Sequence, residues 1–160
     1  MRAGIGWDSH RLEEGRRLVL GGVELAGAGR GLAGHSDADV LTHAVIDALL
    51  GAAGMGDIGE HFPDTDERWR DADSIELLRA ESAMLAEAGE TPSNVDATLA
   101  CEQPKLAAFR DDMRERLAGA IGIEPGAVNV KFTTGERMGF VGRGEGIAAL
   151  AIATLAPGQR

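Results

Sequence analysis

The sequence GHSDADVLTHAVIDALLG, residues Gly34 to Gly51, contains the pattern around which the rest of the chain is organised. Apolar residues recur through it at intervals of three and four, which is typical of a helix with one face in the core. Polar residues recur on the same spacing, at His35, Asp39, His43 and Asp47. Four residues turn a helix by about 400°, so each of these side chains lies about 40° around the helix from the one before. The sequence therefore predicts a largely buried helix that carries a stripe of two imidazoles and two carboxylates.

The ends of this helix are also marked in the sequence. Ser36 or Asp37 is a suitable N-cap, because short polar side chains accept hydrogen bonds from the first free N–H groups of a helix. Gly51 or Gly54 can end it, because glycine readily adopts the left-handed conformation that closes many helices. The face expected in the core is apolar and consists of Val40, Leu41, Ala44, Ile46, Ala48 and Leu49.

Strand and helix patterns alternate on both sides of this helix. Strands are predicted for residues 1–12, 94–100, 128–133 and 147–155, with a short hairpin at 16–25. Further helices are predicted for residues 73–88 and 104–119, and loops for 26–34, 56–66 and 135–146. This order predicts an α/β (α+β) fold, with residues 1–160 as a single domain and a mixed sheet covered by helices on one face.

The composition narrows the class of protein. The chain has 160 residues, of which 44% are hydrophobic and 26% charged, as is typical of one globular domain. A net charge of -10 argues against nucleic acid as a partner, because nucleic acids are bound by clustered Lys and Arg. No apolar run approaches the ~20 residues that span a bilayer, and the N-terminus lacks an apolar signal segment. Since Cys101 is also the single cysteine, we expect a cytoplasmic protein without a membrane partner.

Asp8 and His10 have the spacing of two metal ligands. They lie two residues apart in the first predicted strand, so their side chains project from the same face. A histidine from the helix, such as His43, could supply a third ligand. Two imidazoles and one carboxylate suit Zn²⁺, and three protein ligands leave a fourth position open, as in catalytic zinc sites. The alternative is that His10 and His43 are ordinary surface or hydrogen-bonded histidines, since D-x-H alone is a weak motif.

Longer motifs in the chain resemble a known family. The run GHSDADVLTHAVIDALLGAAGMGDIGEHFPDTD, Gly34 to Asp66, is similar to the signature of the 2-C-methyl-D-erythritol 2,4-cyclodiphosphate synthase family. The resemblance extends from GIGWDSHRL near the N-terminus, through EQPKL (Glu102 to Leu106), to FTTGERMGFVGRGEGI (Phe132 to Ile147). It implies an enzyme of the non-mevalonate (methylerythritol phosphate) route to isoprenoid precursors, here in a monofunctional form.

The resemblance implies a lyase reaction that closes a ring. The 2-phosphate of 4-diphosphocytidyl-2-C-methyl-D-erythritol 2-phosphate attacks the β-phosphate, CMP leaves and a cyclic diphosphate forms. In the family, the residues matching Asp8, His10 and His43 bind one Zn²⁺, which holds and polarises the β-phosphate. The residue matching Glu136 binds a second metal, Mg²⁺ or Mn²⁺, between the α- and β-phosphates. Positive charge at this point offsets the repulsion between two phosphate groups.

The resemblance also implies which residues contact the substrate. His35 and Ser36 would contact its phosphate end. Asp57, Ile58 and Gly59 would contact the methylerythritol hydroxyls, with Phe62 and Asp64 nearby. Ala100, Lys105 and Leu106 would contact the cytidine, and Thr133 and Thr134 the diphosphate. Of these, His35, Asp57 and Thr134 are predicted to be catalytic. Ser36 could also be a simple N-cap and Asp57 a simple turn residue, and for Ser36 the two roles are compatible.

The resemblance further implies a homotrimer around a three-fold axis, with active sites between subunits. The zinc and methylerythritol residues would come from one chain and the cytidine pocket from the next. Phe140 and Arg143 would line a central cavity on the axis, which in relatives holds an isoprenoid diphosphate. Judged from the residues alone, a salt bridge between Arg143 and Glu145 explains that arginine equally well.

Two other functions remain open on the residues. One is a zinc-dependent phosphoesterase, which would leave EQPKL unexplained, and the other is a trimeric zinc-containing binding protein with a closed fourth ligand.

Several residues near the predicted site are given other roles. Asp39 is expected to orient a ligand histidine or to lie on the helix surface, Asp47 to contact substrate or support the metal, His61 to be a structural loop histidine, and Trp7 and Trp69 to be packing residues.

Overall fold

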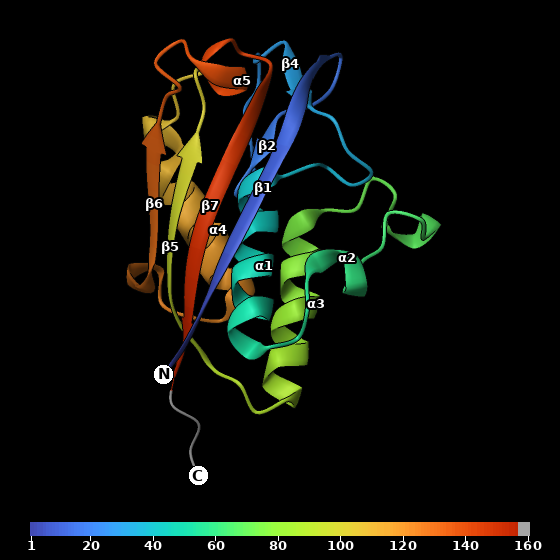
Figure 1. Cartoon of the computed structure of the whole chain (residues 1–160), viewed down its shortest axis with the longest axis vertical. Coiled ribbons are helices and arrows are strands. Elements are labelled where there is room, and N and C mark those ends of the chain that lie inside the picture. Colours follow the sequence, from blue (N-terminus) through green and yellow to red (C-terminus); the bar gives the residue numbers. More distant parts are fainter. Residues whose placement is uncertain (157–160) are drawn as a thin grey trace.

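A mixed sheet of five strands runs through the molecule (Figure 1), and the computed structural model describes residues 1–156. In spatial order the strands are β4 (Arg30–Leu32), β1 (Arg2–Glu14), β7 (Gly146–Leu155), β5 (Pro92–Ala100) and β6 (Val128–Thr133). The pair β5 and β6 is parallel and the other neighbours are antiparallel. A separate hairpin joins β2 (Val19–Leu20) to β3 (Val23–Glu24).

Three longer helices cover one face of this sheet (Figure 1), as predicted. They are α1 (Val40–Ala53), α3 (Ser74–Glu87) and α4 (Arg110–Ile121). Shorter helical turns are α2 (Ile58–His61), α5 (Gly139–Gly142), η1 (Glu67–Trp69), η2 (Ala107–Phe109) and η3 (Pro125–Ala127). Within residues 1–156, every helix falls short of the length and apolar character needed to cross a membrane.

The helix α1 lies directly against β1 because the strand has glycine where the helix backbone approaches. A Cβ atom on Gly4 would lie 2.1 Å from the carbonyl oxygen of Ala48, and one on Gly6 would lie 1.9 Å from that of Ala44. Glycine in a strand interior often marks such a close approach of another backbone. The consequence is that His43, the residue before Ala44, is brought beside β1.

The helix that was expected to start after an N-cap at Ser36 or Asp37 begins later. Its N-cap is Asp39, whose side chain accepts a hydrogen bond from the N–H of Thr42 at 3.1 Å, so the predicted caps Ser36 and Asp37 are wrong. His35 consequently lies in the loop before α1, and the predicted stripe starts only at Asp39. The other end is confirmed, since Gly54 closes the helix with a φ of 70°.

The buried Asp39 has neither of its predicted roles. Its carboxylate oxygens accept hydrogen bonds from the N–H groups of Gly21 and Gly22, at 2.8 and 2.7 Å, and its exposed fraction is 0%. It therefore fastens the β2–β3 hairpin to the start of α1, instead of orienting a ligand histidine or lying on the surface. Burial raises the pKa of this carboxyl group, and the charge of Asp37 adds to the effect.

Three predicted loops contain short regular elements. Residues 26–34 include β4, which pairs with β1 through Leu12 and Leu32. The strand pattern misses it because Gly31 is a poor strand former. A Cβ there would lie 2.0 Å from the carbonyl oxygen of Arg17, so the position needs glycine for close approach. The other two loops hold the single turns α2 and α5, and α4 begins at residue 110 instead of 104.

The face of the sheet opposite the helices carries exposed apolar side chains. Ile5 lies directly across from Ile152, and Trp7 from Leu150, in the β1–β7 pairing. Their exposed fractions are 65%, 46%, 57% and 38%, respectively. The predicted packing role of Trp7 is therefore not seen within residues 1–156, where four exposed apolar side chains lie together on this open face.

Glu81 provides a prediction about stability. This side chain of α3 is fully buried, and among residues 1–156 its Oε1 has no hydrogen-bond partner. Burial raises its pKa from 4.5 to about 8. The folded protein therefore holds a proton that the unfolded chain loses between about pH 4.5 and pH 8, so this residue makes the free energy of unfolding fall as pH rises across that window.

Replacing Glu81 with glutamine should remove this pH dependence, because an amide does not ionise. Relative to the unchanged protein, Glu81→Gln should gain about 3 kcal/mol of stability between pH 5 and pH 8. Urea unfolding at several pH values and constant protein concentration measures this difference. Glu87→Gln, at an exposed position of the same helix, is the matched control. A stability difference that does not change with pH would contradict the assignment.

Candidate active site

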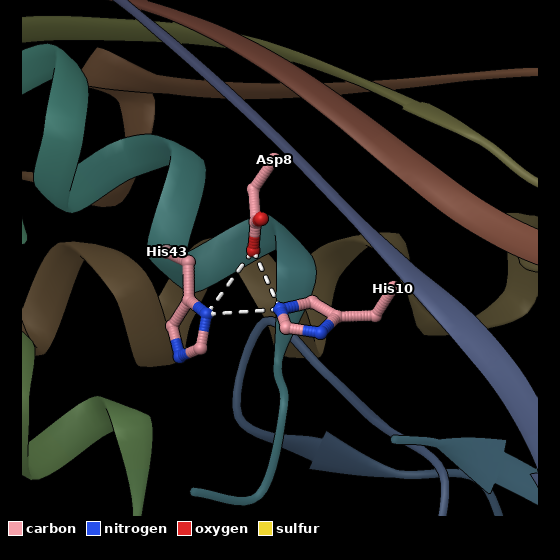
Figure 2. A group of neighbouring side chains, drawn as sticks. All are labelled: Asp8, His10 and His43. Atoms are coloured by element: carbon pink, nitrogen blue, oxygen red, sulfur yellow. Dashed lines mark hydrogen bonds and ion pairs between the residues drawn. The ribbon is translucent and has the colours of Figure 1, made fainter. Parts of the chain in front are cut away.

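Three potential metal ligands meet between β1 and α1 (Figure 2). Asp8 Oδ2 lies 2.9 Å from His10 Nε2 and 3.1 Å from His43 Nδ1, and the two nitrogens are 3.4 Å apart. The side chains of Asp8, His10 and His43 are 25%, 21% and 12% exposed. The predicted triad is therefore present, partly buried and open on one side.

Each member of the triad is oriented by a hydrogen bond on its far side. Asp8 Oδ1 accepts from the N–H of Ser9 at 2.8 Å. His10 Nδ1 lies 2.8 Å from the carbonyl oxygen of Ala33, which can only accept, so Nδ1 carries a proton and Nε2 is the nitrogen left for a metal. His43 Nε2 lies 2.8 Å from Ser74 Oγ. One carboxylate oxygen and two imidazole nitrogens thus converge, a donor set that fits Zn²⁺.

The electrostatics of the triad favour a charged carboxylate. Burial alone would raise the pKa of Asp8, but hydrogen bonds and charge from His10 and His43 hold that pKa well below its usual range. Burial alone would lower the pKa of His10, and the bond to Asp8 raises it instead. A metal ion must displace protons from the histidines, so metal affinity should fall as pH falls.

The triad lies in the wall of a cavity of about 570 Å³, a volume typical of small-molecule sites. The predicted site residues that line it are Asp8, His10, His35, Ser36, His43, Ile58, Gly59, Phe62 and Asp64. Asp47 and Trp69 line it as well. One cavity therefore gathers the predicted metal ligands and most of the residues assigned to the phosphate and hydroxyl end of the substrate.

The loop over this cavity is fastened by carboxylates. Asp47 Oδ1 accepts from the N–H of Ile58 at 2.8 Å, and burial raises the pKa of Asp47. Asp57 is the N-cap of α2, where its Oδ1 accepts from the N–H of Glu60 at 3.1 Å, and it is not among the lining residues. Its catalytic role stays a prediction.

Other side chains near the cavity contact residues of the surrounding loops and turns. Phe62 meets Trp69 edge to face, with ring centroids 5.2 Å apart, which supports the predicted packing role of Trp69. His61 Nε2 lies 2.7 Å from the carbonyl oxygen of Met55, so the predicted structural role of His61 is confirmed. His35 Nε2 lies 3.3 Å from the carbonyl oxygen of Asp66 and lines the cavity.

A second group of predicted residues gathers at the carboxyl ends of the parallel strands β5 and β6. Ala100 pairs with Thr133, and the N–H of Cys101 donates to the carbonyl oxygen of Thr133 at 2.9 Å. The loops that follow are joined, because the N–H of Gly135 donates to Glu102 Oε2 at 2.9 Å. The predicted cytidine residues Ala100, Lys105 and Leu106 and the diphosphate residues Thr133 and Thr134 therefore lie at these two strand ends and on the connected loops that follow.

Glu136 sits in an unusual backbone conformation on the second of these loops. Its φ is 50° and that of Arg137 is 62°, values that are uncommon for residues other than glycine and that concentrate at functional sites. Thr134 Oγ1 donates to Glu136 Oε1 at 2.8 Å. The loop therefore presents a carboxylate and a hydroxyl together.

Within residues 1–156, the 570 Å³ cavity does not bring the two groups of residues together. The cytidine and diphosphate residues and Glu136 are absent from the lining of the 570 Å³ cavity. Phe140 lines a different cavity of about 190 Å³, together with Glu145. Arg143 Nε donates to Glu145 Oε1 at 2.7 Å, which is the salt bridge considered from the sequence.

Ser74 is a site residue that the sequence pattern does not predict. Ser74 is the first residue of α3 and is fully buried, yet its hydroxyl contacts the triad through His43. Nothing in the local pattern relates a serine at the start of one helix to a histidine on another, because the contact depends on how α1 and α3 pack.

Comparison with known proteins is consistent with this site. The family model described as the YgbB family matches residues 1–156. A curated relative from Symbiobacterium thermophilum, named 2-C-methyl-D-erythritol 2,4-cyclodiphosphate synthase, is 56% identical over 98% of this chain and 99% of its own length. A solved structure of a synthase of the same name, in a CDP-bound form, has a TM-score of 0.88 and 36% identity, covering 97% of this chain and 100% of its own.

A longer relative is also similar to this chain. The bifunctional enzyme IspD/IspF of Anaeromyxobacter sp. (strain Fw109-5) is 61% identical over 95% of the chain. The chain spans 39% of that relative's length. The similarity therefore covers only one part of the bifunctional protein.

Proposed function

The chain belongs to the YgbB family, and on that basis we propose that it is a 2-C-methyl-D-erythritol 2,4-cyclodiphosphate synthase, with residues 1–160 as a single domain. It would convert 4-diphosphocytidyl-2-C-methyl-D-erythritol 2-phosphate to the cyclic diphosphate and CMP, in the cytoplasm. The observation that carries the proposal is the convergence of Asp8, His10 and His43 in the wall of the 570 Å³ cavity.

We propose that this triad holds Zn²⁺ as its resident metal. When bound, the ion supplies positive charge where two phosphate groups must approach one another. The nucleophile is already an oxyanion, so the chain needs no strong general base and acts mainly by positioning. In this scheme His35 and Ser36, on the loop before α1, bind the phosphate end of the substrate.

The remaining substrate-binding roles are divided between the residues that bind the hydroxyl groups and those that bind the nucleotide. Asp57, Ile58 and Gly59 bind the hydroxyl groups, beside Phe62 and Asp64, on the loop that Asp47 fastens. The joined loops after β5 and β6 bind the nucleotide: Ala100, Lys105 and Leu106 contact cytidine, and Thr133 and Thr134 contact the diphosphate. The CDP-bound synthase structure similar to this chain supports a nucleotide ligand.

We infer that the active protein is a homotrimer in which each site is completed by a neighbouring chain. Two observations support this: the metal and nucleotide residues occupy separate places in one chain, and the open face of the sheet exposes Ile5, Trp7, Leu150 and Ile152. Covering that face would remove a large apolar area from water. Phe140 and Arg143 would then line a cavity on the three-fold axis, whose ligand would be an isoprenoid diphosphate.

Glu136 is proposed to bind Mg²⁺ or Mn²⁺ together with substrate oxygens, as this class of cation often needs only one protein carboxylate. Replacing it with glutamine should raise the Mg²⁺ concentration needed for half-maximal activity by about tenfold or more, which corresponds to about 1.4 kcal/mol. Zinc content should not change. A Mg²⁺ titration of activity measures the shift, with Glu124→Gln, at an exposed position, as control. An unchanged titration would contradict the assignment.

The proposed function is tested by incubating the protein with the proposed substrate, Zn²⁺ and Mg²⁺, and following products by ³¹P NMR. Cyclic diphosphate together with CMP is the expected result. Release of inorganic phosphate would indicate a phosphoesterase instead. Absence of any reaction by a zinc-loaded protein would point to a binding protein.

A further inference from the structure

A line of polar groups leads away from the triad, through the buried Ser74 to the partly exposed Asp37. His43 Nε2, on the side of the ring that faces away from Asp8 and His10, lies 2.8 Å from Ser74 Oγ. Ser74 Oγ in turn donates to Asp37 Oδ1, and the backbone N–H of Ser74 donates to Asp37 Oδ2 at 3.0 Å. None of these contacts is used by the substrate-binding roles proposed above.

The chemistry of these groups sets the direction of each hydrogen bond. A carboxylate can only accept, so the single hydroxyl proton of Ser74 is donated to Asp37. The oxygen of Ser74 can then only accept a bond from His43, which requires the proton on Nε2. With Nε2 protonated, Nδ1 is the nitrogen left to coordinate a metal, and it is the atom that faces Asp8 and His10 (Figure 2).

Asp37 determines which atom donates and which accepts in the hydrogen bond between Ser74 and His43. Ser36 Oγ also lies near His43 Nε2, at 3.3 Å, but its own proton is not committed to a carboxylate and could be donated to the ring. Asp37 is fixed in turn, because its Oδ1 accepts from the N–H of Asp39 at 3.1 Å. The start of α3, the start of α1 and the metal ligand are thus tied together through one carboxylate.

We propose that Asp37 and Ser74 are positioning residues that hold His43 in the orientation and tautomer that bind the metal. This inference rests on the proposed metal-binding role of the triad but not on which reaction the protein catalyses. Partners of this kind commonly change metal affinity by about 10- to 100-fold when removed.

The test measures zinc affinity by competition with a chromophoric chelator, in the absence of substrate. Ser74→Ala should weaken zinc binding by about 10- to 100-fold. Asp37→Asn should also weaken it, because an amide that donates to Ser74 Oγ frees the hydroxyl proton for His43 Nε2. Ser82→Ala, a serine of the same helix that does not contact the triad, should bind zinc like the unchanged protein.

A second measurement separates positioning from general loss of structure. The absorption spectrum of the Co²⁺-loaded protein should change in Ser74→Ala and Asp37→Asn, while the thermal unfolding of their zinc-free forms stays close to that of the Ser82→Ala control. If Ser74→Ala does not fold, Asp37→Asn carries the same test. Zinc affinity within twofold of the unchanged protein, in either folded variant, would overturn the inference.

The outcomes also distinguish this inference from the proposed function. Weakened zinc binding in the variants of a protein that forms no cyclic diphosphate would leave the positioning role standing and refute the synthase activity. Normal zinc binding in the variants of an active synthase would refute the positioning role and leave the synthase activity standing. Failure of the unchanged chain to bind zinc would refute the positioning role.

Discussion

Replacing His43 with alanine is expected to abolish stoichiometric zinc binding and to lower turnover by about a thousandfold or more. His43 supplies one of three protein ligands, and only Asp8 Oδ2 and His10 Nε2 would remain near the ion. A bound metal contributes several kcal/mol of charge stabilisation in reactions at phosphorus, and each 1.36 kcal/mol is a factor of ten in rate. Asp8→Ala should have a similar effect, since Asp8 Oδ2 contacts both histidines.

Zinc per chain, measured by mass spectrometry of the dialysed protein, and turnover by ³¹P NMR would be determined on the same sample. Asp112→Ala is the matched control for Asp8→Ala, because Asp112 is exposed on α4, away from the triad. It should retain both zinc and activity. A His43→Ala protein that keeps one zinc per chain and full turnover would refute the metal assignment.

Two of the three metal ligands could be predicted because their geometry is local. Residues two apart on a strand share a face, so Asp8 and His10 had to project together once the first segment was recognised as a strand. The apolar pattern of residues 40–49 likewise required a helix with a buried face, and all six predicted core residues are buried. The family motifs then indicated which helix histidine completes the set.

What could not be predicted depends on packing between distant segments. Asp39 was placed on a stripe with His43 by helical spacing, but the hairpin at Gly21 and Gly22 takes its carboxylate. Ser74 contacts His43 only because α3 packs beside α1. Trp7 has a large apolar side chain of the kind expected in a core. It is exposed because helices lie on one face of the sheet only. In each case a pairing between elements, which sequence periodicity does not encode, decides the role of the side chain.

The same dependence on packing makes Gly6 a sensitive position for both fold and site. An added methyl group would lie 1.9 Å from the carbonyl oxygen of Ala44 and 2.7 Å from the N–H nitrogen of Ala48, and both are backbone atoms of α1. Neither can rotate away, so the helix must move from the strand. Overpacking of this kind usually costs 1–3 kcal/mol and sometimes more, and we expect Gly6→Ala to destabilise the protein by about 3 kcal/mol.

Moving α1 also moves His43, which precedes Ala44, away from the two ligands on β1. Gly6→Ala should therefore lose zinc affinity in addition to stability, and the stability loss should be visible in urea unfolding of the zinc-free protein. Gly51→Ala is a stringent control, because its added Cβ would lie 3.8 Å from its nearest neighbour at the same helix–strand contact. Since alanine is the better helix former, that variant should be neutral or stabilised by up to about 1 kcal/mol. Equal stability and zinc affinity in the two variants would mean that close contact between α1 and β1 does not position the metal ligands.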